Sequence, residues 1–206
     1  GTVLFADPTG FDIGTVGLTS GITAAIVGLA SGGPVTQSDP IVATTSLTLF
    51  GLGTPGAATF DLPLGNNVTT IAVHSNSSDV FYSDAEVFDI GAGVWFVNGI
   101  DTGTANLLLR AEDTAGTGTI TQSQPIIAAG FGLISIGDAL LDNAANDVDT
   151  LNISAWSAAD QQIHFTDADG FNLGGVTVFG ITSLADGPGA TANDPDAVLT
   201  LASGGP

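Results

Sequence analysis

The apolar residues of this sequence come in short runs separated by glycine, threonine and aspartate. Over residues 46–50 and 68–74, apolar and polar residues alternate with a period of two, which is typical of β-strands with one buried face. Residues 93–97 and 106–109 are almost continuously apolar, which suits strands covered on both faces. The pattern therefore predicts an all-β fold made of many short strands.

The same pattern recurs along the chain. Residues 35–41 (VTQSDPI) return as 120–126 (ITQSQPI), 85 positions later, and the triplet at 21–23 returns at 99–101 and 180–182. Because these markers keep the same order, chance is a poor explanation for them. We infer a repeat unit of about 85 residues.

The repeat divides the chain into a partial unit (1–34) and two nearly complete units (35–119 and 120–206). The pattern begins and stops within a unit, and the sequence starts without methionine. We therefore expect the units to form one continuous structure that belongs to a longer polypeptide.

Two architectures accept a unit of this length. In tandem immunoglobulin-like β-sandwich domains, each unit would have its own core and a linker to the next. In a parallel β-solenoid, or β-helix, each unit would supply several coils of about 20 residues, stacked on one continuous core. The sequence has no obvious linker. Two pairs of repeat markers show an insertion. Gly180 lies 159 positions after its counterpart Gly21, whereas Ala202 lies 172 positions after its counterpart Ala30. The last unit therefore accommodates 13 extra residues between these markers. These features favour the solenoid over the sandwich.

Composition indicates a folded protein poor in helix. Hydrophobic residues make up 44% of the chain and the mean hydropathy is positive, which excludes disorder. Lysine is absent, Arg110 is the only strong base, and 19 aspartates outnumber 2 glutamates. Helix is disfavoured because Glu, Lys and Arg fill exposed helix faces, whereas Asp and Gly favour turns.

The net charge of −20 limits the classes of molecule that the chain can bind. Nucleic acids and anionic membrane surfaces are bound mainly through lysine and arginine, so both are excluded. No apolar run reaches the roughly 18 residues that a membrane span needs, so we expect no membrane insertion. The absence of cysteine removes disulfides and thiolate metal sites.

Four motifs stand out along the chain: 7–16 (DPTGFDIGTV), 19–23 (TSGIT), 30–37 (ASGGPVTQ) and 66–71 (NNVTTI). Together they resemble the degenerate repeats of large bacterial filamentous-haemagglutinin-like exoproteins. The resemblance implies a right-handed parallel β-helix in a secreted fibre or on the cell surface, with an adhesive or structural role. The amino-terminal secretion domain of that family does not occur in this sequence, which leaves the export route open.

The repeats, the acidic cysteine-free composition and this resemblance predict a structural or adhesive repeat module of a bacterial fibre, adhesin or surface layer. Its expected location is extracellular or on the cell surface. Its expected partners are further turns or copies along the fibre axis, and a host or matrix glycan or protein receptor. The alternative is a polysaccharide-binding or polysaccharide-cleaving β-helix protein.

Aspartates suggest a calcium site. Asp167 and Asp169 are close in sequence, and Asp142, Asp147 and Asp149 form a second group. Carboxylate oxygens are the ligands that Ca²⁺ prefers, although neither an EF-hand loop nor a glycine-rich nonapeptide repeat is present. Ca²⁺ is therefore the one cofactor predicted, with plain turn formation as the alternative.

The polar insertion at 183–197 is a candidate interaction loop, because loops displayed on a rigid scaffold often carry function. Its candidate contact residues are Asp186, Asn193, Asp194 and Asp196. A passive bulge is the alternative.

Catalytic residues are not evident, and we predict that the chain is not an enzyme. The two histidines, His74 and His164, are expected at turns or strand edges. A set of His74, Ser75 and Asp79 would lack a nucleophile elbow and an oxyanion site. A polyuronate lyase would need cationic groups, and only Arg110 is present; a glycosidase would need only two carboxylates.

The remaining conspicuous residues are assigned structural roles. Trp95 and Trp156 have the aromatic rings that stack on sugars, but we expect them to fill the core. The asparagines at 66–67, Asn143 and Asn146 are expected at coil corners, where Asn tolerates left-handed backbone angles.

Overall fold

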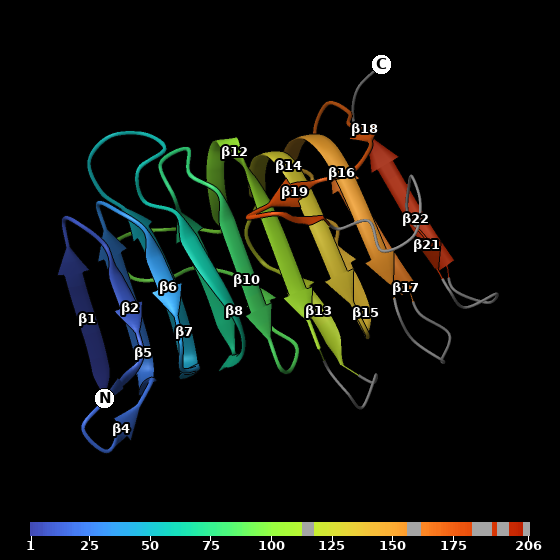
Figure 1. Ribbon diagram of the computed structural model, residues 1–206. Helices are drawn as coiled ribbons and strands as arrows, with labels where there is room; N and C mark the ends of the chain where they lie inside the picture. Colours follow the sequence, from blue (N-terminus) through green and yellow to red (C-terminus); the bar gives the residue numbers. More distant parts are fainter. Residues whose placement is uncertain (113–117, 156–161, 183–190, 193–197, 204–206) are drawn as a thin grey trace.

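The computed structural model describes residues 1–112, 118–155, 162–182, 191–192 and 198–203 (Figure 1). These residues form strands and turns without a helix, as predicted, so no helix in them could cross a membrane. The strands are β1 (Thr2–Asp7), β2 (Phe11–Ile13), β3 (Thr15–Val16), β4 (Thr19–Ser20), β5 (Ile22–Ser31), β6 (Val35–Gln37), β7 (Ile41–Gly51), β8 (Phe60–Val68), β9 (Thr70–His74), β10 (Val80–Asp84), β11 (Asp89–Ile90), β12 (Ile100–Ala111), β13 (Thr119–Gln122), β14 (Ile126–Ser135), β15 (Asp138–Leu141), β16 (Asp147–Ala155), β17 (Gln162–Asp167), β18 (Asn172–Leu173), β19 (Thr177–Val178), β20 (Ile181–Thr182), β21 (Thr191–Ala192) and β22 (Val198–Ser203).

The strands form a parallel β-solenoid. One series of parallel pairings runs through β2, β6, β8, β10, β12, β14 and β16 to β18 and β21, and the other runs through β1, β5, β7, β9, β11, β13, β15, β17 and β22. Since most strands pair with the strand two places later, each turn of the coil contributes one strand to each series. Figure 1 shows the turns side by side along one axis, from β1 to β22. This confirms the predicted solenoid and excludes separate immunoglobulin-like beads.

The turns are longer than the 20 residues expected. The stack has about seven turns, with paired positions about 24 residues apart. Plain turns are short, since Phe60 pairs with Val80 and Phe131 with Leu151. A turn that carries a loop is longer, as where Asp89 pairs with Thr121. The loops leave the coil outward, so the stack is preserved.

A single hydrophobic core runs along the inside of the coil. It extends from Ile13 in the first turn to Phe165 near the other end, and its large fully buried side chains include Phe60 and Tyr82. Parts of the outer face are covered as well. Leu107 and Leu109 point into the core while Leu108 packs in a second, outer cluster, as predicted for this continuous apolar run.

The repeated Thr-Gln-Ser motif ties each of its turns to the turns on either side. The hydroxyls of Thr36 and Ser38 donate to the carboxylate of Asp12 in the preceding turn, at 2.8 and 2.7 Å. Between them, the amide of Gln37 donates to Oδ1 of Asn66 in the next turn. The second copy makes the same bonds: Thr121 and Ser123 to Asp89, and Gln122 to Asn146.

Buried asparagines complete the corners. Oδ1 of Asn66 accepts the N–H of Ile41 at 2.8 Å, and its Nδ2 donates to the carbonyl of Ser83 at 2.8 Å. Asn146 bonds in the same way to Ile126 and Thr166, also at 2.8 Å. The corner role is confirmed for Asn66 and Asn146, although each amide is paired with a glutamine rather than with another asparagine. Asn67 is instead exposed on β8, and none of the four predicted corner asparagines has the left-handed backbone that was expected.

In the part of the chain that the structure describes, three antiparallel hairpins project from the coil at similar positions of the repeat: β3–β4, the loop bridged by Ala92 and Asn98, and β19–β20. The glycine before each Ile-Thr or Ile-Asp pair has a positive φ, 63° at Gly21 and 77° at Gly99. At both positions, a Cβ would lie 2.1 Å from a proline carbonyl oxygen of the next turn. Only glycine fits there, which explains this marker of the sequence.

The buried corner amides predict a stability effect. Asn66→Ala should lower the free energy of unfolding by about 3 kcal/mol, because it leaves the N–H of Ile41 and the carbonyl of Ser83 buried without partners. Urea denaturation followed by circular dichroism measures this change. The neighbouring Asn67 is exposed, so Asn67→Ala should stay within about 0.5 kcal/mol of the wild type. Equal effects of the two changes would contradict the corner role.

Candidate functional site

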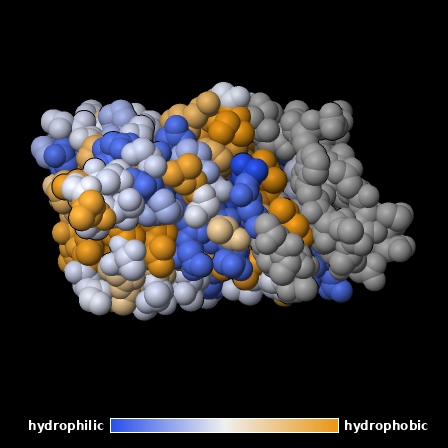
Figure 2. All heavy atoms as spheres, turned by 60° about the horizontal axis from the view of Figure 1, so that its bottom comes forward, coloured by the Kyte–Doolittle hydropathy of each residue, from blue (hydrophilic) through white to orange (hydrophobic). Residues whose placement is uncertain are grey.

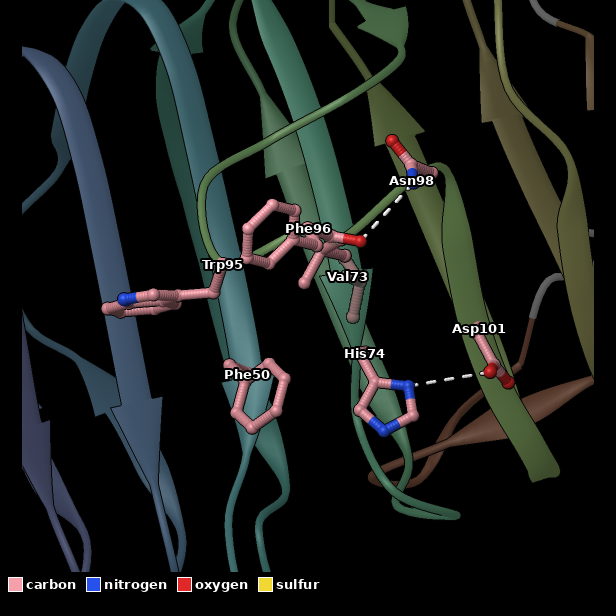
Figure 3. A pocket seen from close by; sticks show the side chains of 8 residues that line it. Phe50, Val73, His74, Trp95, Phe96, Asn98 and Asp101 are labelled. Carbon is pink, nitrogen blue, oxygen red and sulfur yellow. Dashed lines mark hydrogen bonds and ion pairs between the residues drawn. The ribbon is translucent and has the colours of Figure 1, made fainter.

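Three side chains form a row across the outer face of neighbouring strands. Phe50 at the end of β7 pairs with His74 at the end of β9, and His74 pairs with Asp101 of β12. Each follows a buried apolar residue: Leu49, Val73 and Ile100. Because successive residues of a strand point to opposite faces, the row points outward. Figure 3 shows the three side chains beside one another.

The hairpin 91–99 lies over this row. It is closed by a hydrogen bond from the N–H of Gly99 to the carbonyl of Gly91, at 2.9 Å. The N–H of Val94 donates to the hydroxyl of Thr48 at 2.9 Å, so the hairpin folds back across β9 onto β7. Residues 93–97 were expected to form a strand, and that prediction is wrong: the segment lacks a neighbouring turn to pair with and closes on itself instead.

The tip of this hairpin holds two aromatic residues in an unfavourable backbone conformation. Trp95 and Phe96 have φ values of 56° and 61°, a region that bulky residues rarely occupy. The Trp95 ring extends over Gly28, where an added Cβ would lie 2.9 Å from the indole. Trp95 is 37% exposed and Phe96 97% exposed, so the expectation that Trp95 fills the core is wrong. Backbone strain of this kind is often found at functional sites.

The row and the hairpin enclose a pocket of about 350 Å³ that opens to solvent. Nδ1 of His74 lies 3.4 Å from Oδ2 of Asp101, and both side chains are about two-fifths exposed. The Phe50 ring lies 5.3 Å from the His74 ring and 6.1 Å from the Trp95 ring, centroid to centroid. The pocket therefore combines aromatic surfaces with a carboxylate and an imidazole. Its lining residues are Phe50, Val73, His74, Trp95, Phe96, Val97, Asn98 and Asp101.

The described residues of the following repeat differ at the corresponding place. There, Ile134 pairs with Ser154 where Phe50 pairs with His74. The third hairpin buries Val176 and Val178 against the outer face, beside Phe81 and Leu108, and Ile134 is partly buried against this cluster. Neither the aromatic ring at position 50 nor the imidazole at position 74 is therefore required by the solenoid.

The structure does not assemble the catalytic set considered from the sequence. The hydroxyl of Ser75 is buried and donates to the carbonyl of Ser78 at 2.6 Å. The carboxylate of Asp79 accepts the N–H of Asn106 at 2.9 Å. His74 faces Asp101 instead, on the opposite side from Phe50.

The first predicted calcium ligand, Asp167, serves as a corner cap. Its carboxylate accepts the N–H groups of Val148 at 3.0 Å, Asp169 at 3.2 Å and Gly170 at 2.7 Å. Asp84 takes the corresponding place one repeat earlier, where it accepts the N–H of Val68 at 3.1 Å. Asp167 thus has a structural role that does not depend on a metal.

The other predicted ligands lie on the surface. Asp142, Asp147 and Asp149 are exposed. The pKa of Asp147 is raised, first by partial burial and then by the charges of Asp169, Asp167 and Asp149. Within the described residues, no group of three or more His, Cys, Asp or Glu side chains is placed to hold one metal ion. Calcium binding therefore stays a prediction.

The predicted interaction loop, apart from residues 191–192 of β21, lies outside the described residues. This applies to Asp186, Asn193, Asp194 and Asp196, and also to Trp156.

Asp84, which caps the corner at Val68, is a buried carboxylic acid. Tyr82 donates its hydroxyl to Oδ2 of Asp84, and both residues are fully buried. Burial raises the pKa of Asp84 to about 6, although the hydrogen bonds from Tyr82 and from the N–H groups of Glu86 and Val68 partly offset this effect. Burial and the neighbouring carboxylate also raise the pKa of Tyr82 well above its usual value.

No protein-family model, no curated protein and no solved structure matches this chain. The resemblance to filamentous-haemagglutinin-like repeats therefore stays a prediction from the sequence motifs. The features of the molecule that bear on its function are the parallel stack of turns and the pocket beside His74.

Most of the pocket could not be predicted from the sequence. Phe50 carried a usable signal, because the alternation that buries Leu47 and Leu49 directs position 50 outward. Phe96 and Asp101 carried none, since their approach to His74 depends on the fold of the hairpin and on the pairing of β9 with β12.

Asp84 predicts an unusual dependence of stability on pH. A carboxyl whose pKa is raised on folding holds its proton more tightly in the folded state, so its contribution is full below about pH 4 and is lost as the pH rises through about 6. The loss of stability from this group should approach about 3 kcal/mol, and Asp84→Asn should remove that part of the pH dependence. Urea denaturation across this pH range measures it.

The matched control is Asp7→Asn. Asp7 occupies the corresponding corner of the first turn, but hydrogen bonds from Thr9 lower its pKa. This variant should retain the wild-type fall in stability from about pH 4 to about pH 6. An Asp84→Asn variant that also retained the fall would show that other groups cause it.

The calcium prediction is tested by thermal melting. A dedicated site requires that Ca²⁺ raise the melting temperature more than Mg²⁺ does at equal ionic strength, by a few degrees. Asp147→Asn should abolish the difference, whereas Asp61→Asn, on β8, should not. Equal effects of the two cations would show that they only screen the net negative charge.

Proposed function

We propose that this chain is a structural and adhesive repeat module of a secreted or cell-surface bacterial fibre, adhesin or surface layer, and that it assembles end to end. The observation that carries the proposal is the parallel stack itself. Parallel turns can be added along one axis without changing those already present, so the architecture suits an extended rod. Among the described residues, strand β1 pairs with β5 alone, and its other backbone edge can accept a further parallel turn.

Apolar side chains at this end support association. Val16 and Leu18, at the tip of the first hairpin, are 83% and 105% exposed, and Leu4 of β1 is 55% exposed. Figure 2 shows hydrophobic surface gathered at the end of the molecule that carries the first turn. The other two hairpins fold back onto strands of preceding turns. The first hairpin could cover a neighbouring stack in the same way.

A polysaccharide-active protein is the second candidate, and the pocket beside His74 favours it. Cleavage by a glycosidase needs two carboxylates on either side of the scissile bond. The described residues that line the pocket include one, Asp101. Binding is therefore the better supported form of this candidate, and it is compatible with an adhesive fibre.

End-to-end assembly predicts a concentration-dependent increase in particle length. Sedimentation velocity should show elongated oligomers, and electron microscopy should show rods of constant width. The double change Val16→Ser and Leu18→Ser should shift the protein towards single stacks, because it removes the exposed apolar tip. Leu140→Ser, at a residue 40% exposed on β15, which has a paired strand on either side, is the matched control and should leave assembly unchanged. Compact single particles at every concentration would contradict the proposal.

A further inference from the structure

We propose that the pocket formed by Phe50, His74, Trp95, Phe96 and Asp101 binds a neutral saccharide. This inference rests on the proposed adhesive function and names the class of ligand that would be recognised. It follows from the surfaces of the pocket, from the charge of the chain and from comparison of the repeats.

The aromatic surfaces suit the apolar faces of a sugar ring. Trp95 and Phe50 meet nearly edge to face, with an interplanar angle of 70°, so they form two walls rather than one stacked pair. Figure 3 shows Phe50 below Trp95 and Phe96 beside it on the hairpin, with His74 next to Phe50. Exposed aromatic rings offer large contact area at little cost in conformational entropy.

The polar groups suit hydroxyls. The carboxylate of Asp101 is an acceptor, and the imidazole of His74 can donate or accept. Asn98, at the rim, donates its side-chain amide to the carbonyl of Phe96 at 3.3 Å, which leaves its carbonyl oxygen able to accept a bond from the ligand. Pockets of this kind, with a few polar groups among aromatic side chains, are typical of sites for small ligands.

The charge of the chain selects against acidic sugars. The net charge is −20, the only strong base is Arg110, and Arg110 pairs with Glu112 rather than with the pocket. Asp101 adds a carboxylate inside the pocket. Uronic, sialic and sulfated sugars would therefore be repelled, whereas uncharged sugars would not.

The solenoid fold does not require the pocket, and the strained backbone of its hairpin lowers the stability of the protein. The next repeat forms the same strands with Ile134 and Ser154 in place of Phe50 and His74, and there the hairpin packs closely on the outer face. Only the middle hairpin places two consecutive aromatic residues at positive φ. Strain that the fold does not need indicates a role in binding.

The test is binding of the whole chain to uncharged oligosaccharides, with cellobiose, lactose and N,N′-diacetylchitobiose as probes and 3′-sialyllactose as the acidic counterpart of lactose. Isothermal titration calorimetry should detect at least one neutral probe at millimolar affinity or better, and weaker binding of 3′-sialyllactose than of lactose. Imidazole NMR signals should shift for His74 and stay constant for His164, which lies on β17 away from the pocket.

Variants separate the pocket from the fold. Trp95→Ala should weaken binding at least about tenfold, Trp95→Phe should weaken it less because an aromatic ring remains, and Asp101→Asn should also weaken it. Phe179→Ala is the matched control: Phe179 lies at the tip of the third hairpin, also at positive φ and also exposed, and its loss should not change binding. Circular dichroism establishes that each variant is folded.

The outcomes are distinct. No binding of any neutral probe, binding unchanged in folded Trp95→Ala, or equal affinity for 3′-sialyllactose and lactose would overturn this inference. End-to-end assembly is measured without sugar, by sedimentation. A chain that assembles but binds no neutral sugar would overturn the saccharide site alone, and a chain that binds but stays single would overturn the fibre alone.

Discussion

The register between successive turns is the constraint on which the rest of this structure depends. Backbone hydrogen bonds hold parallel turns together, but they allow a strand to slip along its neighbour. The Thr-Gln-Ser motif and the buried corner asparagines remove that freedom. Each of their bonds joins atoms that meet in one register only, as between Gln37 and Asn66 or between Ser38 and Asp12. The repeat conserved within this chain is thus a set of polar contacts at the corners, surrounding a core that needs only apolar side chains.

A stack fixed at its corners tolerates change elsewhere. The first two hairpins re-enter the coil at Gly21 and Gly99, which fit closely against the next turn, so the hairpins can differ in length and sequence without disturbing the strands. Three hairpins at corresponding places show the range. One carries an exposed apolar tip, one holds Trp95 beside an open pocket, and one buries Val176 against the outer face. The outer surface beside a hairpin is therefore where a binding site can be added to a uniform rod.

Much of the fold could be predicted from residue patterns, because its determinants are local and repeated. The period-two alternation in β7 and β9 correctly predicted strands, and the recurring markers correctly predicted a continuous stack of turns in place of separate domains. The length of a turn was underestimated, since outward loops lengthen the path without adding strand pairs. Residues 93–97 were misread because an apolar run looks the same whether it pairs with the next turn or folds back on itself. For Asp167, the Asp-x-Asp-Gly pattern of a metal loop is also the pattern of a corner cap.

By itself, the sequence determined the parallel solenoid, the corner motifs and the inward-facing core, since each follows from residue patterns that recur in the same order along the chain. Only the tertiary structure brought Phe50, His74 and Asp101 into one row and placed Trp95 above it. Those residues come from three different turns and a hairpin, and the length of each turn, which varies with its loops, decides which outward-facing residues become neighbours. A site built from outward-facing positions depends on which turns become neighbours and on where the loop between them comes to lie.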